Sequence, residues 1–299
     1  MSKLTSFLTA TLAVLMFISI APALIVNIKN QYQNLLKPSV NVACVKINCE
    51  IKEAESYCKQ LTEYFKNKSV KAILLEIDSP GGISGSSQAI FNEIQCLKKD
   101  HPKPIVVLSN IACTSGAYYI ACTADHIVTT PSAFVGSIGT VIGFFNIHDV
   151  LKKYNVTYVD KHSGNYKTTG SPYLPLSTEH EKMLQELNES TYNQFITDVA
   201  SCRKLSLKDA DKWANGRTFT GEQALKLGLI DAIGSKYNAI KKIKELALIK
   251  EEENINWLQE KEPNAFAKFL ANNTESKLTA SAVVDALFAK LESSFISRN

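Results

Sequence analysis

The sequence lacks the residue patterns that identify zinc-binding domains, thioredoxin-type redox enzymes and nucleic-acid-binding proteins. Seven cysteines occur, but no two are spaced as Cys-x-x-Cys and no histidine stands at zinc-finger spacing from them. There is no block of basic residues and no stripe of interleaved aromatic and basic residues, and the net charge of +4 is spread along the chain. We therefore expect no metal, no cofactor and no nucleic-acid partner.

The cysteines give no disulfide framework either, because their number is odd. Most of them stand among apolar residues, as Cys44 does between Ala43 and Val45. A free thiol in such surroundings behaves as a small hydrophobic side chain. The sequence therefore predicts mainly buried, unpaired thiols at Cys44, Cys49, Cys58, Cys96, Cys113, Cys122 and Cys202.

Charge is absent from residues 4–26, a segment flanked by Lys3 and Lys29. About 20 apolar residues span the hydrocarbon core of a bilayer. A cleaved secretory signal is the alternative interpretation, since residues 21–23 read Ala-Pro-Ala and resemble a cleavage site. The apolar run continues past that site to Val26, so we predict a retained membrane anchor and linker over residues 1–37. Lysines on both sides leave the orientation open.

Beyond the linker, apolar runs typical of strands alternate with segments of helical periodicity. The run at residues 70–77 is almost continuously apolar, as expected of a strand buried on both faces. Repeated strand-then-helix order predicts an α/β fold with a mostly parallel sheet. The expected strands are 40–47, 70–77, 104–108 and 127–130, and the expected helices between them are 53–65, 85–97 and 115–124.

A long amphipathic helix is predicted over residues 179–202, with Leu184, Leu187, Phe195 and Val199 along one stripe. Two further helices are expected within residues 209–247, around a short extended piece at 217–220. From about residue 250 the chain becomes polar and then amphipathic. We therefore expect one α/β domain over residues 38–248 and a tail over residues 249–299.

Three segments carry groups suited to catalysis, although each has an ordinary structural explanation when taken alone. Residues 78–82, Asp-Ser-Pro-Gly-Gly, follow the buried strand, where α/β proteins place ligands and where glycines allow N–H groups to face a cleft. Ser115 opens a predicted helix, and such a serine is often only an N-cap. Lys167 lies in the turn-rich segment 164–172, where most lysines are merely solvated.

A serine nucleophile needs a base, and the usual histidine is missing. None of the five histidines stands in a recognisable Ser-His-Asp context; they are His101, His126, His148, His162 and His180. Lysine is charged in water at neutral pH, so a lysine acting as base has to be partly buried. The neighbours of Lys167, Tyr166 and Gly164, are compatible with such burial.

Taken together, the motifs resemble those of the single-domain bacterial signal peptide peptidases. The matching motifs are Asp-Ser-Pro-Gly-Gly at 78–82, Thr-Ser-Gly-Ala-Tyr-Tyr-Ile-Ala at 114–121, Gly-Ser-Ile-Gly-Thr at 136–140, Tyr-Lys at 166–167, Gly-Glu-Gln-Ala-Leu at 221–225 and Leu-Gly-Leu-Ile-Asp at 227–231. The similarity covers about residues 40–248, and the step of 52 residues from Ser115 to Lys167 is also that of the family.

This resemblance implies the fold of the Clp protease proteolytic subunit and the crotonases. It implies Ser115 as nucleophile, Lys167 as general base, Ser137 as the residue that orients the lysine, and the N–H groups of Gly82 and Gly116 as the oxyanion hole. It further implies an endopeptidase that degrades signal-peptide remnants at the bacterial inner membrane, with its catalytic domain on the extracytoplasmic side. Homo-oligomeric rings, in which the serine of one subunit meets the lysine of the next, are implied as well.

Two other classes of protein remain open at this point. A crotonase-type acyl-CoA enzyme would share the fold and the glycine oxyanion hole, but the Ser-Lys pair and the anchor speak against it. A catalytically silent assembly scaffold would have no need to retain the serine, the lysine and both glycines.

Overall fold

The computed structural model describes residues 16–17, 21–22, 25 and 39–259. The predicted anchor lies almost entirely outside these residues, as does the tail from residue 260 onward. Within the described ranges, no helix combines the length and the apolar character needed to cross a membrane. The anchor therefore stays a prediction from the sequence.

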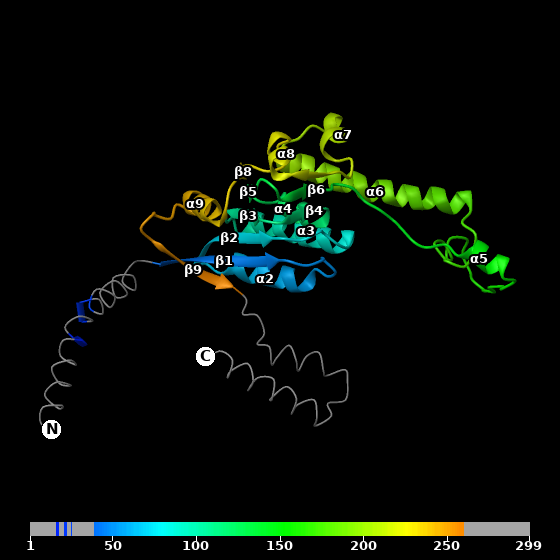
Figure 1. Ribbon diagram of the computed structural model, residues 1–299, viewed down its shortest axis with the longest axis horizontal. Helices are drawn as coiled ribbons and strands as arrows, with labels where there is room; N and C mark the ends of the chain where they lie inside the picture. Colours follow the sequence, from blue (N-terminus) through cyan, green and yellow to red (C-terminus); the bar gives the residue numbers. More distant parts are fainter. Residues whose placement is uncertain (1–15, 18–20, 23–24, 26–38, 260–299) are drawn as a thin grey trace, which may run out of the picture. The chain divides into compact units, whose positions relative to one another are not determined.

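The main sheet has six strands in the order β8-β5-β3-β2-β1-β9 (Figure 1). Each neighbouring pair from β1 to β8 runs in parallel, which confirms the α/β fold with a parallel sheet. The strand bounds are β1 Ser39–Ile47, β2 Val70–Ile77, β3 Ile105–Ser109, β5 His126–Thr129, β8 Ala232–Ile233 and β9 Asn254–Gln259.

Both faces of this sheet are covered, and β2 shows how the sequence achieves this. Ile73, Leu75 and Ile77 point into one core, whereas Ala72 and Leu74 point into the other. Alternation along the strand sends successive side chains to opposite faces, and burying each large aliphatic side chain stabilises the fold by about 1.5–3 kcal/mol. The first core lies beneath α2 (Glu55–Lys66), α3 (Ser84–Asp100) and α4 (Gly116–Ala121), and the second beneath α9 (Lys236–Leu246).

A second sheet of three strands, in the order β4-β6-β7, was not foreseen from the sequence. Its strands are only three residues long: β4 Ala112–Thr114, β6 Phe134–Gly136 and β7 Thr218–Thr220. Only β7 coincides with an expected extended piece. The strands β4 and β6 were not predicted, because strands this short show no readable alternation of apolar and polar residues. The sheet matters for the site, since β4 ends immediately before Ser115 and β6 ends at Gly136.

The long predicted helix is α6 (Thr178–Arg203), and it is capped by the Ser177 side chain. Only its C-terminal half is packed: Phe195 and Val199 are buried, but Leu187 is 54% exposed. The helix is therefore present as predicted, but its apolar stripe is buried at Phe195 and Val199 and exposed at Leu187. At the other end of α6 lie α5 (His148–Lys153) and its loops (Figure 1), and α5 has no buried residue.

The remaining elements close the domain. They are η1 (Leu207–Asp209), α7 (Ala210–Trp213) and α8 (Gly221–Lys226). Thr220 and Gln223 form a capping box that fixes the start of α8. The strand β9 pairs with β1 at the sheet edge, so residues after the expected boundary at 248 still contribute to the main sheet.

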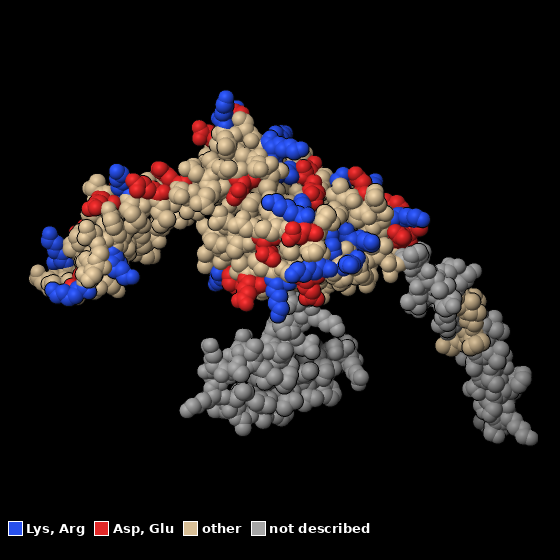
Figure 2. Space-filling model, turned by 180° about the vertical axis from the view of Figure 1, so that it is seen from behind, with Lys and Arg blue, Asp and Glu red and all other residues tan. Residues whose placement is uncertain are grey.

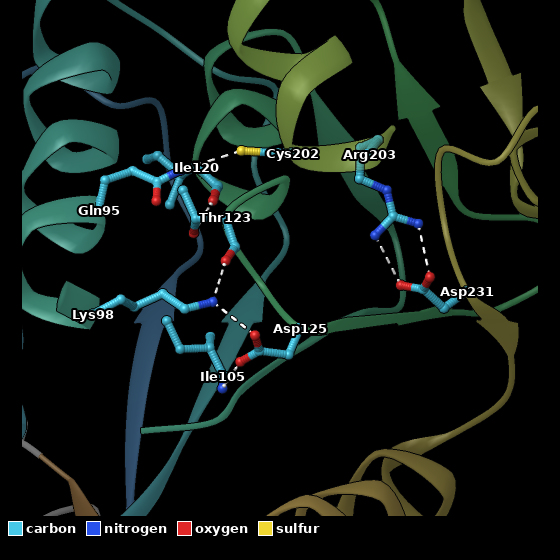
Figure 3. A network of polar contacts seen from close by, with 9 residues as sticks. All are labelled: Gln95, Lys98, Ile105, Ile120, Thr123, Asp125, Cys202, Arg203 and Asp231. Atoms are coloured by element: carbon cyan, nitrogen blue, oxygen red, sulfur yellow. Dashed lines mark hydrogen bonds and ion pairs between the residues drawn. The ribbon is translucent and has the colours of Figure 1, made fainter. Parts of the chain in front are cut away.

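A buried ion pair ties the end of α6 to the strand region near β8 (Figure 3). Arg203, whose side chain is 8% exposed, donates to both carboxylate oxygens of Asp231 at 2.8 and 2.9 Å. Burial alone would raise the pKa of Asp231, but the guanidinium outweighs it and lowers that pKa. Removing one partner of such a pair leaves an unpaired buried charge, which typically costs about 3–5 kcal/mol.

Charges of both signs are mixed over the face shown in Figure 2, and neither sign covers an extended area there. A mixed surface exerts little long-range attraction on a polyanion.

Candidate active site

Ser115 stands at the turn between β4 and α4, in a backbone conformation that few residues other than glycine adopt. Its φ is 53° and its ψ is −126°. A non-glycine residue in such a region costs about 1–3 kcal/mol and persists only where its surroundings enforce it. Here its N–H donates to the Gly136 carbonyl at 2.7 Å and its carbonyl accepts from the Tyr119 N–H at 3.0 Å. The Ser115 hydroxyl makes no capping bond, so it is available for chemistry.

The loop at residues 78–82 lies against this turn because backbone hydrogen bonds hold it on two sides. On one side, the Ser79 N–H donates to the Ala112 carbonyl at 2.7 Å. On the other, the Ile51 N–H donates to the Gly81 carbonyl at 2.8 Å, and the Ile83 N–H donates to the Ile51 carbonyl at 2.8 Å. The loop thus continues the parallel backbone hydrogen bonding of the sheet beyond the end of β2.

Asp78 holds the segment that leads into β4. Its Oδ1 accepts hydrogen bonds from the N–H groups of Asn110 and Ile111, at 2.8 and 2.7 Å, and from the Ser109 hydroxyl at 3.2 Å. Hydrogen bonds to a charged acceptor contribute about 1.5–3 kcal/mol each. The first residue of the Asp-Ser-Pro-Gly-Gly motif is therefore a structural acceptor that positions the strand leading to Ser115.

Three glycines let the two backbones approach more closely than side chains allow. A Cβ added at Gly81 would lie 2.7 Å from the Gly116 nitrogen and 2.8 Å from Ser115 Cβ. One added at Gly116 would lie 2.2 Å from Ser87 Oγ, and one added at Gly82 would lie 2.2 Å from the Ile51 carbonyl oxygen. At Gly81 and Gly82 the added Cβ would meet backbone atoms, so glycine is required there; at Gly116 it would meet the hydroxyl of the Ser87 side chain.

Two backbone N–H groups beside Ser115 are left unengaged. Gly116 is the first residue of α4, so its N–H has no acceptor within the helix. The Gly82 N–H finds no backbone acceptor in the described part of the chain, and its nitrogen would lie 3.4 Å from a Cβ built on Gly116. Paired N–H groups aimed at one point can stabilise an oxyanion.

These groups open onto a cavity of about 280 Å³ between α3, α4, α6 and the loop after β6. No histidine lines this cavity. Its walls are formed by Gly82, Ser84, Gly85, Gln88, Ser115, Gly116, Tyr119, Gly139, Thr140, Thr191, Gln194 and Phe195.

Tyr119 forms part of the wall of the cavity. Its ring stacks on Phe195 with centroids 4.4 Å apart, and its hydroxyl donates to the Asp198 carboxylate. Gln88 donates to the Tyr119 hydroxyl at 3.3 Å and to Gln194 Oε1 at 2.8 Å. Burial raises the pKa of Tyr119, so the phenol stays neutral and acts as a fixed, partly polar wall.

The other predicted site residues lie elsewhere. Ser137 adjoins the site through its neighbour Gly136 and has a positive φ of 49°, but it does not line the cavity. Lys167 is exposed, in a turn held by the bond from its own N–H to the Gly164 carbonyl at 3.1 Å. Within one chain, the structure thus brings Ser115, Gly82 and Gly116 together and leaves Lys167 outside their cavity.

The sequence did not predict which other residues line the cavity at Ser115. Tyr119 was visible only as part of the Thr-Ser-Gly-Ala-Tyr-Tyr motif. Gln88 and Gln194 come from two helices far apart in sequence, and no local pattern marks them. Cys113, two residues before Ser115, is a structural thiol, because burial raises its pKa.

The parallel α/β fold is Clp protease-like. The family model for Clp protease matches residues 27–134, and the model for peptidase family S49 matches residues 97–250. The chain belongs to peptidase family S49, and the resemblance to signal peptide peptidases is confirmed.

Similar proteins carry protease names. A putative protease of Methanocaldococcus jannaschii is 34% identical over 72% of this chain and 68% of its own. A putative protease of Synechocystis is 36% identical over 58% of this chain and 62% of its own. A putative signal peptide peptidase of Enterococcus faecium is 35% identical over 64% of this chain and 55% of its own, so the match covers little more than half of that relative.

One prediction concerns the close contact between α3 and α4. Gly116→Ala should lower the rate at which a fluorophosphonate labels Ser115 by about 10²-fold, because the added methyl group displaces the oxyanion donors. Ser87→Gly, combined with Gly116→Ala, should restore part of that rate, since it removes the Oγ that the methyl group would meet at 2.2 Å.

The matched control is Gly143→Ala, where nothing lies within 4 Å of the new Cβ. It should label as fast as the unmodified chain. Equal labelling of the Gly116→Ala chain would show that this contact does not set the site's geometry.

Proposed function

We propose that this S49 protease is a membrane-anchored serine endopeptidase that cleaves peptides through an acyl-enzyme formed on Ser115. The observation that carries the proposal is the unengaged Ser115 hydroxyl in one cavity with the N–H groups of Gly82 and Gly116. In this mechanism the hydroxyl attacks the scissile carbonyl, and the two N–H groups stabilise the tetrahedral oxyanion. Water then releases the acyl group.

A crotonase-type acyl-CoA enzyme is the competing function on this fold. It would use the same pair of glycine N–H groups but would need no nucleophile. The strained backbone at Ser115, which presents a free hydroxyl to the cavity, favours acyl transfer to the serine.

Lys167 is proposed as the general base, acting on the serine of a neighbouring subunit in a ring. Its exposure in one chain leaves the side chain accessible to a neighbouring subunit. Packing against a neighbour would remove water from Lys167 and favour the neutral amine. Ser137 would then hydrogen-bond the amine and orient it.

The segment that carries Lys167 has the exposed apolar surface that such packing needs. Exposed apolar side chains of this extent mark interaction surfaces more often than solvated loops. Those more than half exposed here include Val141, Phe145, Val150, Tyr154, Val156 and Val159.

The proposed substrates are short apolar peptides, such as signal-peptide remnants, at the bacterial inner membrane. The small cavity beside Ser115 suits side chains of small or medium size. Peptides with leucine or alanine before the cleaved bond should be turned over faster than peptides with arginine or glutamate there, in a peptide-library assay. No metal or cofactor enters the proposed chemistry.

The dyad is tested by single substitutions. Ser115→Ala should abolish fluorophosphonate labelling, and Lys167→Arg should lower peptide turnover by about 10²–10⁴-fold, because arginine stays charged and cannot act as base. Lys161→Arg, in the same exposed segment, is the matched control and should keep full turnover. A Lys167→Arg chain with a near-normal rate would contradict the proposed base.

The shared site is tested by mixing two inactive chains. Ser115→Ala and Lys167→Ala subunits in one ring would pair an intact serine with an intact lysine wherever the mutants adjoin in the right order. Up to about a quarter of the normal activity should return, if mixing is random and the sites act independently. Verified mixed rings without recovered activity would mean that each chain builds its own dyad.

The anchor is tested on membranes. The intact chain should sediment with membranes and resist alkaline extraction, because residues 4–26 are uncharged and long enough to span the bilayer. Protease added to intact spheroplasts should digest the catalytic domain if it lies on the extracytoplasmic side. Complete protection would place the domain in the cytoplasm.

A further inference from the structure

A second cavity, of about 580 Å³, lies where the C-terminal ends of α3, α4 and α6 meet. It shares no lining residue with the cavity at Ser115. Two cysteines from different helices line it, Cys122 and Cys202, together with the cationic side chains of Lys98, Arg203 and Lys204. Figure 3 shows Gln95, Lys98, Cys202 and Arg203 around this region.

The two thiols line the same cavity although 80 residues separate them in the sequence. Cys122 is the C-cap of α4 and is buried, and its thiol donates to the Tyr119 carbonyl at 3.1 Å. Cys202 is the penultimate residue of α6 and is only partly buried, so reagents in the cavity can reach it.

The surroundings of Cys202 favour its thiolate. Gln95 Nε2 donates to Cys202 Sγ at 3.2 Å (Figure 3). The pKa of Cys202 is lowered, chiefly by its interaction with Cys122; burial and the Asp198 carboxylate oppose this shift, and Gln95 and Lys98 reinforce it. Cys122 differs, because burial raises its pKa well above that of a free thiol. Lys98 and Arg203 are paired with Asp125 and Asp231, which line the same cavity, so Gln95 is the neutral donor closest to the sulfur. Partly exposed thiols with a lowered pKa are the more reactive ones, and buried thiols are inert until a partner reacts.

We propose that Cys122 and Cys202 form a reversible intrachain disulfide by exchange with a small disulfide of the glutathione class. The Cys202 thiolate attacks one sulfur of the small disulfide, forms a mixed disulfide and expels one thiolate. The Cys122 sulfur then attacks Cys202, loses its proton and expels the second. Two protein thiols are oxidised, the small disulfide is reduced to two thiols, and the two protons end on those thiols.

This bond would join two helices that also form the cavity at Ser115. The helix α4 begins directly after the nucleophile and supplies Tyr119 to the wall, whereas α6 supplies Gln194 and Phe195. The C-terminal ends of α4 and α6 carry Cys122 and Cys202 and line the second cavity. The disulfide therefore fixes one wall of the peptidase cavity against the other, and it does so without touching a residue assigned to catalysis.

The experiment uses the full chain, purified in detergent and incubated with excess oxidised glutathione. Alkylation and mass spectrometry should then show two fewer free thiols and one peptide pair linked through Cys122 and Cys202. Cys96→Ser, which removes an exposed thiol, is the matched control and should give the same linked pair. Gln95→Leu should slow formation of the link about fivefold, because it removes a donor to the thiolate.

A second variant tests the order of the two steps. In Cys122→Ser, with a melting temperature near that of the unmodified chain, glutathione should remain trapped on Cys202. A linked pair formed by other cysteines would overturn the proposal, as would a lasting glutathione adduct on Cys202 in the unmodified chain. Absence of the adduct from folded Cys122→Ser would refute Cys202 as the first thiol to react.

Discussion

The contact between the backbone of the loop at residues 79–82 and the turn at Ser115 sets the geometry of the whole site. A Cβ at Gly81 would fall 2.7 Å from the Gly116 nitrogen, so only glycine allows the two segments to lie this close. Hydrogen bonds from Ser79 to Ala112 and from Thr114 to Ser79, at 2.7 and 3.3 Å, hold the segments together. The main sheet places the loop and the short second sheet places the serine, so neither sheet alone creates the paired N–H groups.

This contact also explains how the strained backbone at Ser115 persists. Its positive φ costs about 1–3 kcal/mol, which is a sizeable part of the net stability of a domain. The Gly136 carbonyl accepts from the Ser115 N–H on one side, and the buried helix α4 holds the chain on the other. Asp78 reinforces the approach to β4 through the N–H groups of Asn110 and Ile111. Hydrogen bonding before Ser115 and helix packing after it thus offset the cost of its strained backbone.

The long parallel strands could be predicted from the sequence because near-continuous apolar runs such as Val70–Ile77 have few alternatives to a buried strand. The neighbourhood of Gly82 and Ser115 was implied by the resemblance to signal peptide peptidases; the position of residues 78–82 after a buried strand placed only that loop at a ligand-binding edge. The three-residue strands β4 and β6 were missed because nothing periodic fits in three residues. Gln88, Thr191 and Gln194 were missed because their place in the cavity depends on how α3 and α6 pack, which no local pattern encodes.

The proposed ring would account for both the exposure of Lys167 and the uneven packing of α6. The C-terminal half of α6 is buried by its own domain through Phe195 and Val199, whereas Leu187 and the apolar side chains of the preceding segment stay exposed. Within the chain, only half of the helix's apolar stripe is buried. The exposed half is suited to pack against a second molecule. The lysine lies in the same uncovered segment, so one packing event would bury both the stripe and the base. In this arrangement the burial that a lysine base requires would be available only in the assembled ring, which would keep single chains inactive.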